Sequence, residues 1–165
     1  MAISTVVKNF RDGTILIEDG TTPTALAVTV QFETGDFSAD GFNEGLVDVT
    51  TYLDRGEMGS LRKTNRTFPT FSFTAHMTDL SDATDKLIFD IVRKANAFSS
   101  AKSTLGTNAD VYTLKVTCTV EGSNFGDSTD HVLVLNDCRL SIGLSEGDPN
   151  SFSISGTVYG AVSAT

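Results

Sequence analysis

The sequence predicts a mainly β fold, an antiparallel β-sandwich or barrel-like domain with one flanking α-helix, and two observations lead to it. Apolar and polar residues alternate with a period of two over most of the 165 residues, as in strands whose side chains point to opposite faces. One segment departs from this period and has helical spacing instead. A chain of this length fits one core, so residues 1–165 are expected to form a single domain.

The first half of the chain is expected to contain four amphipathic strands, because apolar residues occupy every second position in each. The first contains Ile15 and Ile17, and the second covers residues 26–32. The third covers residues 46–54 and the fourth covers residues 71–77. Each is expected to turn one face toward a core.

The second half is expected to contain four more strands. The most regular alternation covers residues 112–120. Residues 131–135 are apolar on both faces, which is typical of a strand that is covered on both sides. Strands over 140–145 and 152–158 are separated by the turn sequence EGDPN at 146–150, which predicts a hairpin.

The segment with helical spacing predicts one α-helix over about residues 83–95. Ser81 or Asp82 is expected to cap its start, and Arg93 and Lys94 favour the negative end of its dipole. Such a helix can cover one face of a sheet but cannot close both of its edges. Its apolar stripe consists of Leu87, Ile88, Ile91, Val92 and Ala95.

Two stretches show no regular period and are interpreted as connections. Residues 98–110 are rich in Ser, Lys and Asn, and a long, locally basic loop is expected at about 55–67. Long loops without secondary structure are often functional. The basic loop could pair with carboxylates of another copy of this acidic chain, or it could be an ordinary solvated loop. Its candidate contact residues are Arg55, Leu61, Arg62, Lys63 and Arg66.

The charge of the chain argues against tight nucleic-acid binding. Twelve basic and twenty-one acidic residues give a formal net charge of -9. Such a surface repels phosphates within a Debye length of about 8–10 Å, although the same acidity also suits simple solubility. No long apolar run or basic N-terminal leader is present in the sequence, so a soluble protein made in a cytoplasm is expected, without membrane insertion.

No combination of residues with catalytic or metal-binding spacing is found. His76 and His131 have no metal-spaced partner, and the sequence has no nucleophile elbow or phosphate-binding loop. Cys118 and Cys138 are expected to be buried free thiols, with a disulfide between neighbouring strands as the alternative. The chain is therefore not expected to be an enzyme or to need a cofactor.

Six strings, taken in order, resemble the tail tube (major tail) proteins of long-tailed bacteriophages. Together with the plan of strands, one helix and further strands, they cover most of the chain. The strings are DGTILIEDG (12–20), QFETGDF (31–37), TYLDRGE (51–57), LSDATD (80–85), VYTLK (111–115) and EGDPN (146–150).

This resemblance implies a structural virion protein whose copies assemble into hexameric rings. The strands of each ring would join into a continuous inner barrel, and the rings would stack into the hollow tail tube through which phage DNA is ejected into the host. The implied partners are other copies of the chain, a tape measure protein and a tail terminator, and the implied location is the virion tail, assembled in the host cytoplasm. The loop at 55–66 would pack on the adjacent ring.

The resemblance also implies an acidic lumen. Candidate lumen-facing acids are Glu33, Asp48, Asp54 and Glu121.

Three other interpretations remain open. The first is the inner-tube protein of a contractile injection or type VI secretion system, which has the same ring-forming fold. The second is a monomeric β-sandwich such as a decoration protein or adhesin, although the chain has no tryptophan to anchor a binding patch. An enzyme is the third, and loss of activity on changing His76 or His131 would favour it.

Overall fold

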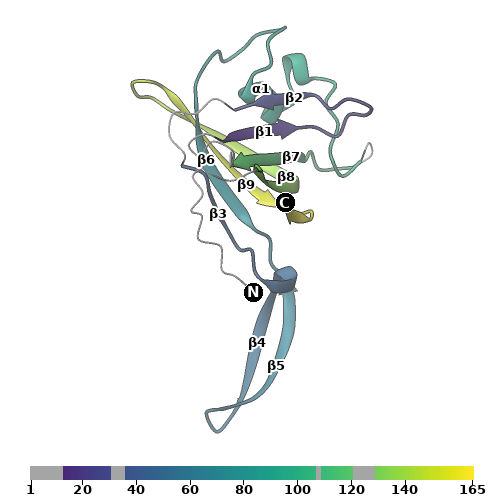
Figure 1. Cartoon of the computed structure of the whole chain (residues 1–165), viewed down its shortest axis with the longest axis vertical. Helices are drawn as coiled ribbons and strands as arrows, with labels where there is room; N and C mark the ends of the chain where they lie inside the picture. Colours follow the sequence, from purple (N-terminus) through teal and green to yellow (C-terminus); the bar gives the residue numbers. More distant parts are fainter. Residues whose placement is uncertain (1–12, 31–35, 107–108, 121–128) are drawn as a thin grey trace.

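A computed structural model describes residues 13–30, 36–106, 109–120 and 129–165. These residues form antiparallel strands and a single short α-helix, as the sequence predicted (Figure 1). The strands are β1 (Thr14–Glu18), β2 (Ala27–Thr29), β3 (Ser38–Asp40), β4 (Val47–Asp54), β5 (Glu57–Arg66), β6 (Thr70–His76), β7 (Leu114–Val120), β8 (His131–Ser145), β9 (Ser151–Val158) and β10 (Val162–Ala164).

The main sheet has the strand order β2-β1-β7-β8-β9-β6-β3, and β10 pairs with β8. The strand β8 belongs to both halves of this sheet. Its first part pairs with β7 and β10, and its part from Cys138 onward pairs with β9. At the bend between them, Asp137 has a φ of 53°. The sequence had suggested two separate strands here, and the structure shows one long bent strand.

The bend folds the sheet into two layers that enclose one core. Alternate residues of β1 and β7 in the first layer and of β6 and β9 in the second are buried, which confirms the predicted period of two. Ile17, Val116 and Ile154 are at most 1% exposed and belong to the same cluster. Each layer therefore has one face in the core and one face away from it.

The helix α1 runs over Ile88–Arg93 and is shorter than predicted. Asp82 does not cap it, because its Oδ1 accepts hydrogen bonds from the N–H groups of Thr84 and Asp85 in a separate turn. The helix ends at Lys94, which has the left-handed conformation. Ile88 and Ile91 are buried against the sheets, so the helix covers one open side of the sandwich, as expected.

The prediction of an irregular loop at about 55–67 is wrong, because Glu57–Arg66 forms β5 and pairs with β4. All ten residues of β5 are exposed. A register shift between Met58 and Ser60 places Met58 and Leu61 on one face although they are three residues apart, so β5 shows no period of two.

The strand β4 was recognised by its period, but the expectation that residues 46–54 turn one face toward the core is wrong, because none of the residues of β4 is buried. The prediction for residues 98–110 is confirmed in the described part, where no strand forms.

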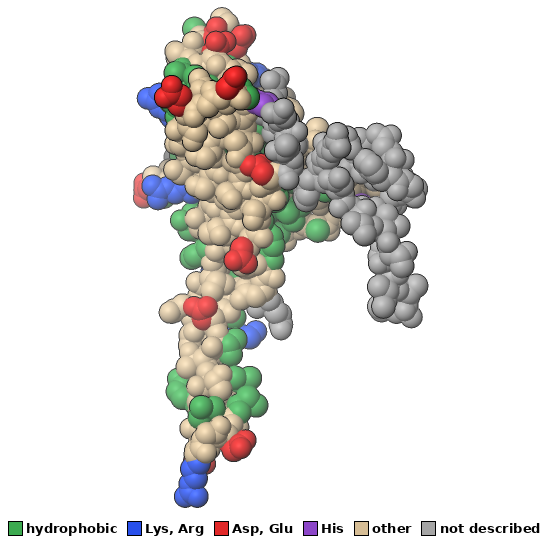
Figure 2. Space-filling view, turned by 90° about the vertical axis from the view of Figure 1, so that its left-hand side faces the viewer, with side chains coloured by type: hydrophobic (Ala, Val, Ile, Leu, Met, Phe, Trp, Pro, Cys, Tyr) green, Lys and Arg blue, Asp and Glu red, His purple; other side chains and the backbone are tan. Residues whose placement is uncertain are grey.

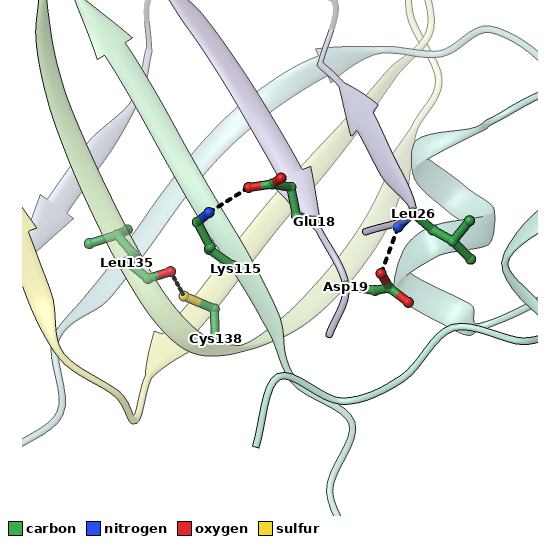
Figure 3. A network of polar contacts seen from close by, with 6 residues as sticks. All are labelled: Glu18, Asp19, Leu26, Lys115, Leu135 and Cys138. Atoms are coloured by element: carbon green, nitrogen blue, oxygen red, sulfur yellow. Dashed lines mark hydrogen bonds and ion pairs between the residues drawn. The ribbon is translucent and has the colours of Figure 1, made fainter. Parts of the chain in front are cut away.

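Asp19 joins the irregular connection at residues 98–110 to the first layer of the sandwich. Asp19 is 4% exposed, and its side chain accepts a hydrogen bond from the backbone N–H of Leu26 at 2.7 Å (Figure 3). It accepts a second from the backbone N–H of Lys102 at 2.8 Å. Burial raises the pKa of this carboxyl, but the hydrogen bonds from Thr21, Lys102 and Leu26 together hold it below its ordinary value. Asp19 is thus an ionised, buried acceptor that fixes two loops.

Candidate assembly surfaces

The strands β4 and β5 form a hairpin that extends from one end of the two-layered body (Figure 1). Its two-residue turn is Arg55–Gly56, where both residues have positive φ angles, 52° and 89°. This is the geometry that matches the twist of two antiparallel strands. The predicted contact residue Arg55 therefore lies at the tip of an extended arm.

One face of the hairpin is apolar and uncovered. The register places Thr51 opposite Leu61 and Leu53 opposite Met58, so these side chains share a face. Leu53, Met58 and Leu61 are 64%, 65% and 55% exposed. Green apolar side chains gather along the arm in Figure 2. A two-stranded hairpin is at best marginally stable alone, so this face is a surface that a partner can cover.

The opposite face of the hairpin is polar. Thr50 lies opposite Arg62, and Asp54 lies opposite Glu57 beside the turn. The Arg62 guanidinium lies over the ring of Tyr52, 5.7 Å from its centroid. The predicted contact residues Leu61 and Lys63 share the apolar face, whereas Arg62 belongs to the polar one.

Arg66 differs from the other predicted contact residues because it binds the body of its own subunit. Its Nη2 donates a hydrogen bond to the carbonyl oxygen of Tyr159 at 2.9 Å, and its guanidinium lies over the ring of Phe68 at 5.1 Å. The rings of Phe68 and Tyr159 are 4.9 Å apart. These contacts join the base of the hairpin to the end of β9 and orient the arm.

The second layer, β3-β6-β9-β8, has two open edges among the described residues. The strand β3 pairs only with β6, and the part of β8 after Cys138 pairs only with β9. Open edges present unpaired N–H and C=O groups and therefore invite pairing with another chain. The sequence did not reveal β3, because a strand of three residues is too short to show a period.

Of the four acids predicted to line a lumen, Asp48 and Asp54 lie on the hairpin. The structure places neither on the four-stranded layer. Glu33 and Glu121 lie outside the described residues. The structure of the subunit therefore does not test the prediction that these four acids face a lumen.

The two histidines lie on different strands of the described part of the chain. His76 lies half-buried at the end of β6, and His131 lies exposed at the start of β8. Within the described ranges, no group of three or more His, Cys, Asp or Glu could hold a metal ion, and no helix has the length and apolar character needed to span a membrane.

Both cysteines are buried free thiols, as predicted. The Cys138 thiol donates to the carbonyl oxygen of Leu135 at 3.3 Å (Figure 3). Burial raises the pKa of Cys118 and of Cys138 to about 12, so neither is a thiolate at neutral pH. Neither thiol is suited to nucleophilic chemistry.

Three solved structures that share this fold are chains of the PVC contractile injection system and of the anti-feeding prophage. A chain of the sheath/tube terminator of the extracellular contractile injection system PVC, in its extended state, aligns with a TM-score of 0.57 and 10% identity over 99% of both chains. A chain of the tube terminating cap of the anti-feeding prophage aligns with a TM-score of 0.56 and 11% identity, over 100% of this chain and 94% of that one.

A chain of the PVC sheath-tube complex aligns with a TM-score of 0.52 and 11% identity, over 92% of this chain and 87% of that one. No family model matches the sequence, and no curated protein sequence matches it. At such identities the alignments show a shared fold, which runs through nearly the whole length of each chain.

Proposed function

We propose that this chain is a structural subunit of a phage-like tail tube, and that its copies assemble into hexameric rings that stack into a hollow tube. The tube conducts phage DNA into the host. The subunit works by assembly and needs neither catalysis nor a cofactor. The observation that carries this proposal is the four-stranded layer β3-β6-β9-β8, which is open at both edges among the described residues.

Ring closure follows from the directions of these four strands. Each is antiparallel to its neighbour, so β3 and β8, at the two edges, run in opposite directions. A rotation about the tube axis can therefore place β8 of one copy beside β3 of the next, and the new pair is antiparallel as well. Closing the ring in this way removes every exposed edge of the layer.

Six copies make a barrel of a plausible size for this role. Four strands from each copy give about 24 strands, and with a spacing of about 4.8 Å and a tilt of about 40° the barrel measures roughly 48 Å across. That diameter leaves room for a nucleic-acid duplex after the wall side chains are added. The hexamer itself is taken from the resemblance to tail tube proteins.

The hairpin supplies the contact between stacked rings in this proposal. It extends from one end of the body, and its exposed Leu53, Met58 and Leu61 can bury their side chains on the adjacent ring. Arg55, Arg62 and Lys63 bring positive charge to a partner that carries a net charge of -9. Burial of apolar side chains and attraction between opposite charges thus favour the same contact between rings.

A tube protein of a contractile injection system is the second candidate, and the fold likeness to PVC and anti-feeding prophage structures favours it. The subunit would assemble in the same way but would conduct a different cargo. Both assemblies are soluble particles made in a bacterial cell. Genes for a tape measure protein and a tail terminator beside this one support the phage tail, whereas genes for a sheath and a secretion ATPase support the second candidate.

Electron microscopy of the purified chain tests the proposal. Rings or tubes with a central channel are expected at high protein concentration. A shortened chain, in which an Asn-Gly turn replaces residues 52–60 and joins Thr51 to Leu61, keeps the body and loses most of the arm. It should form rings that do not stack. A particle that stays monomeric at every concentration, ionic strength and pH at which it is folded contradicts the proposal.

A further inference from the structure

The face of β3, β6, β9 and β8 that points away from the core consists mainly of hydroxyl side chains. Strand registers place its members in rows across the layer, and ten of its fourteen positions are Ser or Thr. None of the fourteen is buried. This hydroxyl face comprises Ser38, Asp40, Thr70, Ser72, Thr74, His76, Arg139, Ser141, Gly143, Ser145, Ser151, Ser153, Ser155 and Thr157.

Charge is depleted on the central strands β6 and β9 of the hydroxyl face. Charged residues make up 20% of the chain, and exposed sheet positions are where such residues usually lie. The charged side chains lie at its edges, with Asp40 on β3 and Arg139 on β8. Asp36, just before β3, lines one groove of the face, and its Oδ1 accepts a hydrogen bond from the N–H of Thr74. The central strands β6 and β9 contribute one ionisable group, His76, at the end of its strand. The middle of the face is therefore neutral.

The hydroxyl face also lacks the features of a protein interface. Its members include no apolar or aromatic side chain, whereas interface centres are enriched in aromatic residues, Met and Arg and depleted in Ser. Figure 2 looks onto the side of the body formed by β3, β6 and β9, and most of that surface is tan, with scattered red acidic side chains and little green. The hairpin, with its green side chains, contrasts with it.

The hydroxyl face is hollowed along its length. Two open grooves lie on it and share Ser72, Ser141 and Ser155 as lining residues. On the opposite side of the same strands, Phe73 and Phe152 lie in the core, under the first layer of the sandwich. In a closed ring the bulky first layer must lie outside, so the hollowed face with the shortest side chains lies inside.

We infer that the hydroxyl face is the wall of the tube's bore, a wet and nearly neutral surface past which a nucleic-acid duplex slides. The inference rests on the proposed function and adds to it the residues and the chemistry of the wall. It assigns the wall to Ser and Thr side chains of the four-stranded layer. Asp48 and Asp54 are not part of this wall, because they lie on the hairpin.

The chemistry of the wall suits passage without binding. Proteins hold nucleic acids by arrays of Lys and Arg on the phosphates, and this wall offers one Arg139 in each subunit, on an edge strand. Hydroxyl groups bind water as donors and acceptors, so the wall stays hydrated without attracting phosphates. Repulsion by many acids, which the resemblance led us to expect, is not needed when attraction is already absent.

Cysteine labelling of assembled tubes tests the position of the wall. Ser155→Cys and Ser72→Cys lie at the middle of the hydroxyl face, and Thr29→Cys lies exposed on β2 in the other layer. The native thiols are buried and stay silent. The probes are a small maleimide and a maleimide attached to a globular carrier protein that is wider than the bore.

The carrier is expected to label all three variants as free subunits, and only Thr29→Cys after assembly, with at least a tenfold loss of rate at positions 72 and 155. The small maleimide should label all three in both states. If tubes form and the carrier labels Ser155→Cys as fast as Thr29→Cys, the inference is overturned while the proposed function stands. If no ring or tube forms, both are overturned.

A second measurement tests the chemistry of the wall. Wild-type tubes are expected to retain no short DNA duplex after gel filtration at 50 mM salt, a low ionic strength that favours phosphate binding. Tubes of Ser155→Lys should retain duplex that is protected from nuclease and released by salt. Tubes of Thr29→Lys should bind only duplex that nuclease degrades. Salt-sensitive, nuclease-protected retention by wild-type tubes contradicts a neutral wall.

Discussion

Arg62 lies over the ring of Tyr52 on the polar face of the hairpin, 5.7 Å from the ring centroid. The two side chains come from paired strands, β5 and β4, so the ring holds the guanidinium at a defined place on an otherwise uncovered arm. A cation fixed in this way can meet a carboxylate of another copy with little loss of side-chain freedom.

The double variant Arg62→Ala, Lys63→Ala is expected to weaken ring stacking and leave the fold intact. Tubes should be shorter in electron micrographs, and the difference from wild type should shrink as salt is added, because salt screens the charge pairs. Arg93→Ala is the matched control, since Arg93 also lies over a ring, that of Phe89, but on the body of the subunit. Equal shortening by both variants would argue against a role of the arm's charge.

The double variant Leu53→Ser, Leu61→Ser is expected to raise the protein concentration needed for tubes by tenfold or more. Each substitution removes about 1.5–3 kcal/mol of apolar burial at the contact, and about 1.4 kcal/mol corresponds to tenfold. Sedimentation across a concentration series measures the change, and the melting temperature should stay near that of wild type. Leu105→Ser, at an apolar residue on the body that is 53% exposed, should change neither quantity.

Asp19→Asn is expected to destabilise the subunit by about 1–3 kcal/mol, the usual effect of weakening hydrogen bonds to a buried charged acceptor. Urea unfolding measures it, with the exposed Asp79→Asn as the control. Because the pKa of Asp19 lies below its ordinary 3.8, the carboxylate contributes stability above that pH and loses it as pH falls through the folded value. The difference between wild type and Asp19→Asn should therefore shrink below about pH 3.8.

Cys118 and Cys138 are expected to resist thiol reagents in the folded subunit up to about pH 9, because burial raises both pKa values to about 12 and excludes the reagent. A chromogenic disulfide reagent should report two thiols per chain after addition of denaturant and none before. Rapid native reaction of either thiol would show that its strand opens.

Gly156→Ala is expected to destabilise the subunit by about 1–3 kcal/mol, as overpacking of a filled core does. A Cβ at this position would overlap the ring of Phe71 and lie 2.9 Å from Cδ2 of Leu140. Thermal unfolding measures the effect. Ser155→Ala, the neighbouring residue on the exposed face of β9, should change the melting temperature little, and a comparable loss there would point to strand propensity as the cause.

The sequence predicted most reliably the strands with one face in the core. Burial selects every second residue in β1, β6, β7 and β9, and each of these was recognised by its period. The strand β5 was missed because a register shift separates its apolar residues Met58 and Leu61 by three positions, and β3 and β10 were missed because three residues cannot show a period.

The candidate site was predicted in part, for similar reasons. The basic residues of the arm were recognised by their contrast with an acidic chain, but the apolar face depends on which residue lies opposite which across the hairpin. The dipeptide Arg55–Gly56 between two polar segments was the available signal for a turn. The pairing of Leu53 with Met58 includes a register shift that no single-strand pattern contains.

The bend of β8 at Asp137 also has a mechanical consequence. The two layers of the sandwich are joined there by continuous backbone, in addition to their packed side chains. A load that drew the two layers apart would pull along covalent bonds through residues 136–138, whereas two sheets joined only by loops would resist it by side-chain packing until those loops were extended. A tube built from this subunit could thus stretch its hydrogen-bonded seams between copies before any subunit splits into its layers.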